Sequence, residues 1–315
     1  MKLGYALSSE EHTPQDLVGY AREAEERGFD FAFISDHFHP WVSRQGNSPF
    51  VWSVLGAISQ VTQRIQLGTG VTAPIIRTHP AVIAQAAATA AAMLPGRFMF
   101  VVGTGENLNE HVVGENWPGP DQRLAMLEEA IEIIRLLWTG EEVTFRGRQF
   151  KVDRARLYTL PDEPPPILVA AKGKKALELA GQTGDGLIGL TPEREFIESF
   201  EQAGGRAKPR YGQMHVCWAE READAKRTAH EWWPNTAVDG KKTVDLATPS
   251  DFEAEDVSAD EVAEKVVLGP DPKTHLNLIR RYEEAGYDHV YVHQIGPDQH
   301  GFFAFYQEEI LPELR

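Results

Sequence analysis

Residues 2–34 read KLGYALSSEEHTPQDLVGYAREAEERGFDFAFI and contain the pattern that decides the fold. The first few residues are apolar and short enough for a strand. Thr13 and Pro14 then supply an N-cap and a first-turn proline for a helix, which Gly28 stops. Residues 29–34 predict a second strand. This succession of strand, helix and strand is the unit from which parallel α/β sheets are built.

The same alternation continues along most of the chain. Strands are expected at residues 2–6, 29–34, 64–69, 97–102, 166–170, 186–189, 213–219 and 289–293. Helices are expected between them at residues 14–27, 51–61, 80–93, 121–137, 173–181, 193–203 and 273–285. Strands joined by such crossovers run parallel, so this order predicts an α/β fold of the (β/α)8 TIM-barrel class.

Two stretches interrupt the alternation and are expected to be insertions. Residues 142–152 hold two alternating segments joined by Arg-Gly, which predicts a β-hairpin. Residues 235–257 are polar and aperiodic, which predicts a long loop or short helices at the C-terminal mouth of the barrel. We therefore expect residues 1–315 to form a single TIM-barrel domain. Two doubly wound domains are the alternative, which is weakened because no G-x-G-x-x-G opens the first helix.

The composition describes a globular protein with a sizeable core, since 42% of its 315 residues are hydrophobic. Its 31 Lys and Arg against 47 Asp and Glu give a formal charge of −16, so we expect no nucleic-acid partner. Cys217 is the one cysteine, and Met1 leads into a strand without a signal-peptide pattern. From these two features we expect a cytoplasmic location. We also expect no membrane partner, because the apolar run at residues 81–93 is shorter than the about 18 residues that a membrane-spanning helix needs.

In a barrel of this class the active site lies at the C-terminal ends of the strands. The residues that follow each predicted strand are therefore the first place to look for chemistry. Four segments in these positions carry polar groups: SDHFHPW at 35–41, GTGVTAP at 68–74, GTGENLNEH at 103–111 and AAKGKK at 170–175. Their side chains are expected to converge on one mouth of the barrel.

The first of these segments and the third contain candidate proton-transfer groups. Asp36 beside His37 can orient the imidazole for proton transfer, and Trp41 offers a flat wall for a planar ligand. The alternative is that Asp36 caps the following segment and that His37 is only packed. Glu106 lies in a glycine turn at a strand end, where it is either a functional carboxylate or a helix cap.

The segment AAKGKK opens a predicted helix and is a candidate anion site. Free N–H groups at a helix start, together with Lys172, Lys174 and Lys175, would suit a phosphate. The alternative is a solvated lysine cluster at the start of a helix. This local positive charge is what an anionic ligand would need on a protein of such negative net charge.

The 11 histidines do not indicate a metal site, and none is expected. His37 and His39 are two residues apart and would point to opposite faces of an extended segment. His289 and His293 lie in a strand pattern rather than in an H-x-x-x-H helix. Serine-nucleophile and P-loop motifs are also absent from the sequence.

Seven motifs in order carry a family resemblance: KLGYALSSEE, SDHFHPW, LGTGVTAP, HPAVIAQ, VVGTGENLNE, AGQTGDG and GPDQHGFFAFYQ. From Lys2 to the C-terminus the chain resembles the luciferase-like monooxygenase superfamily, and within it the branch of F420-dependent glucose-6-phosphate dehydrogenases. The resemblance implies a TIM barrel that binds the deazaflavin coenzyme F420 with its ring at the strand ends. It also implies a homodimer formed through barrel helices.

The resemblance implies roles for individual residues. His37 and Trp41 would flank the reacting centre, and Glu106 would face the deazaflavin N1 as proton donor or acceptor. Glu10 would contact the substrate hydroxyl. The residues implied to bind the cofactor are Asp36, Gly70, Val71, Asn109, Ala170, Ala171, Lys172 and Gly173. The family has a non-prolyl cis peptide behind the ring, which here falls between Gly70 and Val71, while Lys172 replaces a usual glycine of the cofactor-phosphate loop.

The expected activity is that of an F420-dependent dehydrogenase or reductase acting on CH–OH groups. A hydride would pass between the substrate carbinol or carbonyl carbon and the deazaflavin C5, with His37 either taking the hydroxyl proton or stabilising its charge. The alternatives are an FMN-dependent monooxygenase of the same superfamily and a non-catalytic binder of flavin or deazaflavin. The intact Asp36, His37, Trp41 and Glu106 argue against the non-catalytic binder.

The chain departs from this branch at four positions that hold the sugar phosphate in its members. Leu190 stands at a threonine, Glu193 and Glu264 stand at two lysines, and His300 or Gly301 stands at an arginine. A carboxylate repels a phosphate dianion, so we expect an unphosphorylated sugar, alcohol or aldehyde as substrate. The alternative is a sugar 6-phosphate held at a shifted site by the neighbouring residues, Arg194 and Lys265.

Overall fold

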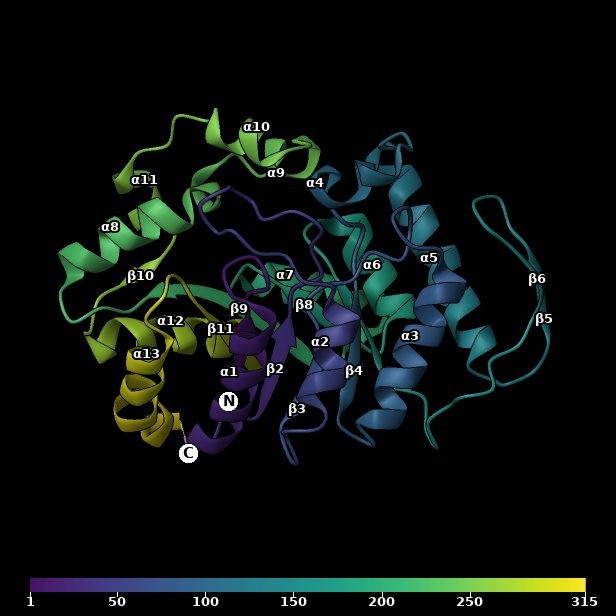
Figure 1. Cartoon of the computed structure of the whole chain (residues 1–315), viewed down its shortest axis with the longest axis horizontal. Coiled ribbons are helices and arrows are strands. Elements are labelled where there is room, and N and C mark those ends of the chain that lie inside the picture. Colours follow the sequence, from purple (N-terminus) through teal and green to yellow (C-terminus); the bar gives the residue numbers. More distant parts are fainter. Residues whose placement is uncertain (315) are drawn as a thin grey trace.

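The computed structural model describes residues 1–314 and forms a closed barrel of parallel strands (Figure 1). The barrel strands are β1 (Lys2–Leu7), β2 (Phe31–Ile34), β3 (Gln66–Thr69), β4 (Phe98–Val102), β7 (Ile167–Ala170), β8 (Gly186–Gly189), β9 (Arg210–Cys217) and β11 (His289–Gln294). Each pairs in parallel with its neighbour, and the pairing of β8 with β9 closes the ring. The predicted TIM-barrel class is confirmed.

The outer ring consists of helices that follow the barrel strands. These are α1 (Pro14–Arg27), α2 (Val51–Ile58), α3 (Pro80–Met93), α5 (Pro120–Leu137), α6 (Lys174–Thr183), α7 (Arg194–Phe200), α12 (Pro272–Ala285) and α13 (Gln299–Phe305). Helix α1 has the predicted ends, because the Thr13 side chain accepts a hydrogen bond from the Asp16 amide and Gly28 takes a left-handed φ of 93°. None of the helices within residues 1–314 is long and apolar enough to cross a membrane.

All barrel strands except β8 differ from their predicted bounds by one to three residues at one end or both, and β2 and β9 show why. Strand β2 begins two residues later than predicted, because the Phe29 amide still donates to Ala24 at the end of α1. Strand β9 begins at Arg210 and not at residue 213, because Arg210 pairs with Leu187 of β8. It ends before Trp218, whose amide donates to the side chain of Gln294 instead of to a neighbouring strand.

Alternate side chains of the strands fill two cores. Those pointing into the barrel form one buried cluster: Ala6, Phe31, Phe33, Met99, Val101, Leu168, Ile188, Tyr211 and Tyr291. Those pointing outward, such as Leu3, Tyr5 and Leu7, pack against the helices. Gly4 faces Phe31, and a Cβ atom there would lie 2.4 Å from the ring, so only glycine leaves room for this aromatic filling. The interior below the mouth is therefore solid.

Residues 143–155 form an antiparallel pair of strands in the segment where a hairpin insertion is predicted, and the second strand extends three residues beyond the predicted end at 152. Strands β5 (Val143–Arg146) and β6 (Lys151–Ala155) pair antiparallel beside α5, far from the mouth insertion (Figure 1). The carboxylate of Glu129 on α5 accepts hydrogen bonds from the amides of Arg148, Gln149 and Phe150 in the hairpin turn. The hairpin is thus attached to the outer ring and takes no part in the mouth.

The predicted mouth insertion is also present and consists of short helices (Figure 1). Between β9 and α12 the chain forms α8 (Glu222–Trp232), η3 (Pro234–Ala237), α9 (Lys242–Asp245), α10 (Pro249–Glu253), α11 (Ala259–Ala263) and β10 (Val267–Leu268). Two further short helices, α4 (Asn107–Glu110) and η1 (His111–Val113), follow β4, and α4 lies beside α9 of the insertion (Figure 1). Three short segments extend helices of the outer ring. Helix α7 continues into η2 (Glu201–Gly205), and α13 continues into η4 (Tyr306–Ile310) and η5 (Leu311–Leu314).

Candidate functional site

The C-terminal ends of the strands surround a cavity of about 720 Å³. Its walls come from the ends of the barrel strands, from α6 and from the mouth insertion. The predicted site residues that line it are Glu10, His37, Trp41, Gly70, Val71, Glu106, Ala170, Ala171, Lys172 and Gly173. Two predicted residues, Asp36 and Asn109, do not line it.

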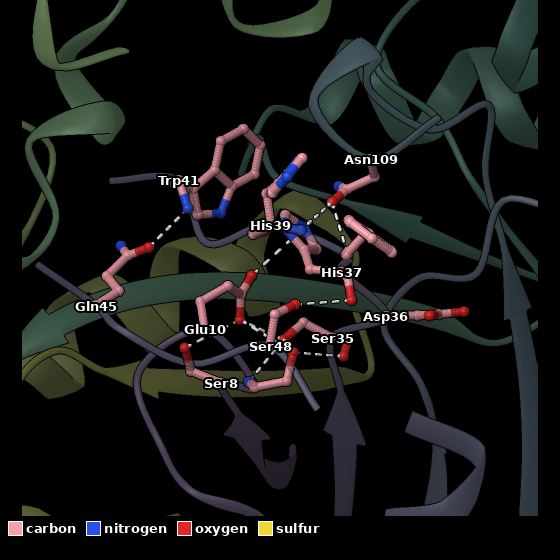
Figure 2. A network of polar contacts seen from close by, with 12 residues as sticks. Ser8, Glu10, Ser35, Asp36, His37, His39, Trp41, Gln45, Ser48 and Asn109 are labelled. Atoms are coloured by element: carbon pink, nitrogen blue, oxygen red, sulfur yellow. Dashed lines mark hydrogen bonds and ion pairs between the residues drawn. The ribbon is translucent and has the colours of Figure 1, made fainter. Parts of the chain in front are cut away.

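Glu10 and His37 form the central polar pair of the cavity (Figure 2). The Nε2 atom of His37 lies 3.4 Å from Oε1 of Glu10, and both side chains are more than nine-tenths buried. The other carboxylate oxygen accepts hydrogen bonds from the hydroxyls of Ser35 at 2.5 Å and Ser8 at 3.2 Å. These hydroxyls fix the carboxylate and leave Oε1 directed to the imidazole.

The surroundings of Glu10 favour its ionised form. Burial on its own raises the pKa of Glu10, but the nearby His37 and the hydroxyl of Ser35 oppose it, and the resulting pKa lies below the usual value. The Nδ1–H of His37 donates to the carbonyl of His39 at 3.1 Å, which places the free lone pair of a neutral ring on Nε2. His37 can therefore take up a proton at Nε2 beside a carboxylate that stabilises the charged ring.

Trp41 stands next to this pair, with its ring centroid 4.9 Å from that of His37. Its backbone amide donates to Gln45 at 2.8 Å (Figure 2). On its outer side Phe252 of α10 meets it edge-on, with ring centroids 5.3 Å apart. Phe252 belongs to a buried cluster with Val42, Leu108 and Val238, so the mouth insertion holds the indole against the cavity.

Asp36 and Asn109 support the loops around the cavity from behind. The carboxylate of Asp36 points away from Glu10 and His37 (Figure 2) and accepts hydrogen bonds from Thr72 and Arg77 at 2.7 Å each. The side-chain oxygen of Asn109 accepts hydrogen bonds from the amides of Phe38 and His39. Both residues fix the shape of the loop that carries His37, a relationship that residue types alone do not show.

The loop after β3 supplies another wall of the cavity. The peptide bond between Gly70 and Val71 is cis, as the family resemblance predicts. Val71 lines the cavity and lies against Gly103, where a Cβ atom would be 2.9 Å from a methyl group of Val71. Glycine at position 103 therefore leaves the space that Val71 occupies.

Glu106 lies at the start of α4 and lines the cavity, but its side chain makes no capping hydrogen bond. The alternative role as a helix cap is thus absent from the structure. Behind it lies Glu110, which is 1% exposed and accepts a hydrogen bond from the amide of Arg77 at 2.8 Å. Burial raises the pKa of Glu110 to about 7, against the attraction of Arg77 and with repulsion from Glu106 and Asp36.

One end of the cavity is basic. Its cations are Lys172, Lys174 and Lys175 at the start of α6 and Arg123 at the start of α5. Gly173 precedes α6 with an extended backbone, and a Cβ atom there would have no neighbour within 4 Å, so the first amides of the helix are open to a ligand. The Nε atom of Arg123 is buried without a hydrogen-bond partner among the described residues. Unused donors and positive charge fit the phosphorylated tail of a cofactor.

The opposite end of the cavity has a different character. It is formed by the ends of β9, β11, β1 and β2, which contribute Gln213, His215, Tyr291, His293, Glu10 and His37 and neither lysine nor arginine. Of the four positions that differ from the phosphate-binding pattern, Leu190 lines the cavity, whereas Glu193, Glu264 and His300 do not. His300 instead contacts Glu23 at 2.7 Å on the outside of the barrel.

Sequence reasoning missed several lining residues. Arg123 lies at the start of α5, His215 lies inside a strand, and Trp233, Asn235 and Thr243 lie in or beside the mouth insertion. No motif marks them, because Arg123 and His215 reach the cavity through the packing of α5 and β9 in the barrel, and the other three reach it through the fold of the insertion. The one available indication was the position of residues 235–257 after a barrel strand, where mouth insertions line active sites.

Comparison with known proteins finds consistent similarities. Residues 1–289 match the family described as luciferase-like monooxygenase. The F420-dependent glucose-6-phosphate dehydrogenases of Nakamurella multipartita and Beutenbergia cavernae are each 37% identical to the whole chain, which covers 97% and 98% of them. A solved structure described as an F420-dependent secondary alcohol dehydrogenase in complex with an F420-acetone adduct superposes with a TM-score of 0.92. That protein is 30% identical, with 100% of this chain and 99% of the other covered.

Proposed function

The chain belongs to the luciferase-like monooxygenase family, and we propose that it is an F420-dependent dehydrogenase whose substrate is an unphosphorylated alcohol, aldehyde or free sugar. The observation that carries the substrate assignment is the contrast between the two ends of the cavity. The four cations of the wall lie at the starts of α5 and α6, while the end beside His37 holds the carboxylate of Glu10 and no lysine or arginine.

The distribution of charge along the cavity wall fits the deazaflavin coenzyme F420. The amides at the start of α6, with Lys172 and Arg123, would hold its anionic tail. Val71 and Trp41 would flank its ring, and the carboxylate of Glu106 would hold or donate a proton at the deazaflavin N1. When bound, the cofactor supplies a carbon that accepts or releases a hydride. Asp36 and Asn109 would act by fixing the loop between His37 and His39.

His37 and Glu10 manage the proton of the substrate hydroxyl. In the direction of oxidation, Nε2 of His37 takes the proton of the alcohol as its carbon loses a hydride. The ionised Glu10 stabilises the imidazolium across 3.4 Å, while the carbonyl of His39 keeps the ring in place through Nδ1. A positioned acid or base of this kind contributes about 10²–10⁴ in rate.

The observations favour this function over flavin-dependent oxygen chemistry. Two relatives that are 37% identical over their length and one structure at 30% identity are described as F420-dependent. All three descriptions name a dehydrogenase, of glucose 6-phosphate in two cases and of a secondary alcohol in the third. The test is titration of the apoprotein with F420 and with FMN. We expect saturable, tight binding of F420 and much weaker binding of FMN. Tight FMN binding with oxygen consumption would instead support the monooxygenase alternative.

The organisation of residues 1–315 as a single domain and the homodimer remain predictions. Limited proteolysis that yields no stable fragment would support the single domain. Sedimentation equilibrium that gives twice the mass of one chain would support the homodimer.

A further inference from the structure

Glu11, the neighbour of Glu10 in sequence, begins a row of three hydrogen-bonded side chains that the proposed proton transfer does not use, two of them buried and the third partly exposed. Its Oε1 accepts a hydrogen bond from the amide of Gly296 at 2.8 Å, and its Oε2 lies 2.7 Å from Nε2 of His293. The Nδ1 atom of His293 lies 2.9 Å from Nδ1 of His215. The side chains of Glu11 and His293 are 0% and 2% exposed.

These groups lie at the cation-free end of the cavity. His215 on β9 and His293 on β11 are directly opposite each other in parallel register, and β11 pairs with β1, which precedes Glu11. The two strands lie side by side in Figure 1. Both histidines line the cavity that also contains Glu10 and His37.

The hydrogen bonds determine where each ring carries its proton. When His293 is neutral, the carboxylate of Glu11, which only accepts, requires the ring proton on Nε2 and leaves a lone pair at Nδ1. His215 must then donate from its own Nδ1, which leaves its Nε2 as a bare acceptor. Burial, and after it the nearby His293, lower the pKa of His215 to about 3, in agreement with a neutral ring.

This acceptor has no partner within the described part of the chain. His215 is partly exposed where it lines the cavity, and its one side-chain hydrogen bond is to His293. Asn235 lines the same cavity, is 7% exposed and has a buried oxygen without a partner among residues 1–314. The ring of Trp233 lies 4.3 Å from that of His293 and holds it in place. Buried or half-buried polar atoms without a hydrogen-bond partner are uncommon in folded proteins, so these two atoms in the cavity wall fit a site that binds a polar ligand.

We propose that His215 is a specificity-determining residue that accepts a hydrogen bond from a second hydroxyl of the substrate, and that Glu11 and His293 are positioning residues that keep it an acceptor. The preferred substrates are therefore diols and polyols, free sugars included. The inference rests on the proposed function, because it assigns one hydroxyl to His37 and another to His215.

Glu11→Gln is expected to reverse the direction of this hydrogen-bond chain. The amide of Gly296 needs an acceptor, so the glutamine oxygen stays on it and the NH2 group faces His293. Nε2 of His293 then accepts, its Nδ1 donates to His215, and Nε2 of His215 carries the proton. An acceptor in the cavity becomes a donor without a change in volume.

Nitrogen NMR of histidine-labelled protein at pH 8 tests the proton positions without turnover. The wild type should show a non-protonated Nε2 on His215, and Glu11→Gln should move the proton to that atom. Addition of cyclohexane-1,3-diol should shift the Nε2 resonance of His215 in the wild type, and its monomethyl ether should not. Protonated Nε2 in the wild type, or equal shifts with both probes, would overturn the proposal.

Kinetics with F420 test the specificity. We expect the wild type to favour cyclohexanediols over their monomethyl ethers by about tenfold in kcat/KM, since one buried hydrogen bond distinguishes them. His215→Phe should bring this ratio to about one, and Glu11→Gln should bring it to one or invert it, while F420 affinity stays within about twofold.

The two hypotheses fail differently. Loss of activity by the same factor for diol and ether in His215→Phe would show a merely structural role and overturn the inference. A wild-type ratio near one would do the same. Failure of the wild type to bind F420, or to oxidise any of these alcohols with it, would overturn the proposed function instead.

Discussion

Nε2 of His37 lies 3.4 Å from Oε1 of Glu10 in a setting where both side chains are more than nine-tenths buried. The carboxylate has its other oxygen occupied by serine hydroxyls, and the imidazole has its other nitrogen occupied by a carbonyl. One position between the two residues is left for a proton, and it faces the cavity. This pair is the basis of the proposed alcohol chemistry.

Glu10→Gln should lower kcat/KM for alcohol oxidation by about a hundredfold, because the neutral amide no longer stabilises a charged His37. His37→Ala should lower it on a similar scale. F420 affinity, measured by fluorescence titration, should be retained in both. Glu23→Gln, which alters a carboxylate on the outside of the barrel, is the matched control. Unchanged rates in Glu10→Gln and His37→Ala would remove this pair from the mechanism.

Glu106→Gln should lower turnover with cofactor affinity largely retained. The amide keeps nearly the same shape in the cavity wall, where the Glu106 side chain makes no capping hydrogen bond, but it cannot exchange a proton with the ring. Steady-state rates at saturating F420, beside a binding titration, separate the two effects. Loss of affinity with a normal rate at saturation would show that Glu106 binds the cofactor and moves no proton.

Glu110 should make the free energy of unfolding fall as pH rises. The pKa of this carboxyl is raised to about 7 in the folded chain, so the unfolded chain releases the proton at lower pH. The stabilising contribution of the protonated form is complete below the unfolded pKa and is lost as pH rises through about 7. A shift of this size corresponds to about 3 kcal/mol at most.

Urea unfolding of the wild type and Glu110→Gln between pH 5 and pH 8 measures this contribution. The variant should gain stability relative to the wild type as pH rises, since its side chain does not ionise. Glu115→Gln, which removes an exposed carboxylate of the same region, should follow the wild-type profile. Parallel profiles for all three proteins would contradict the assignment.

The sequence predicts those helices and strands whose ends and faces are determined by residues close to them in the chain. It does not predict elements that depend on contacts with distant residues. Helix α1 has its predicted ends because Thr13, Pro14 and Gly28 act within one turn of them. Helix α8 was not predicted, because it buries only the small side chains of Ala225 and Ala229 and shows no apolar stripe.

The candidate site shows the same division. His37, Trp41 and Glu106 directly follow barrel strands, and all three line the cavity as the order of strands predicts. The carboxylate of Asp36 is turned toward Arg77, which is 41 residues away along the chain, and no local pattern announces that contact. The hydrogen-bonded side chains of Glu11, His293 and His215 are also far apart in the sequence, and no local pattern predicts their contacts.

Phe252→Ala should lower kcat/KM for alcohols by about tenfold while leaving F420 affinity nearly unchanged. The substitution removes the ring that meets Trp41 from the mouth insertion, so the indole loses its fixed position. Phe252→Leu should restore part of the rate, because it refills the buried cluster. Phe50→Ala, at a ring that is 66% exposed, is the control. Wild-type kinetics in Phe252→Ala would show that the insertion does not position Trp41.

Lys172→Ala should weaken F420 binding by a few fold and leave turnover at saturating F420 unchanged, because an exposed cation contributes about 1 kcal/mol or less to binding an anion. The effect should shrink as ionic strength rises. Lys226→Ala, which removes a lysine paired with Asp260 away from the cavity, should change neither quantity. A loss of turnover without a loss of affinity would place Lys172 nearer the reacting groups than its position before α6 indicates.

Substrate preference shows whether this chain uses F420 to oxidise or reduce an unphosphorylated hydroxyl compound or a sugar phosphate. The measurement is kcat/KM with F420 for glucose, glucose 6-phosphate and simple secondary alcohols under one set of conditions. Because the end of the cavity beside His37 holds Glu10 and no lysine or arginine, the unphosphorylated compounds should be preferred. A preference for glucose 6-phosphate of more than about tenfold, equivalent to ~1.4 kcal/mol, would contradict the account.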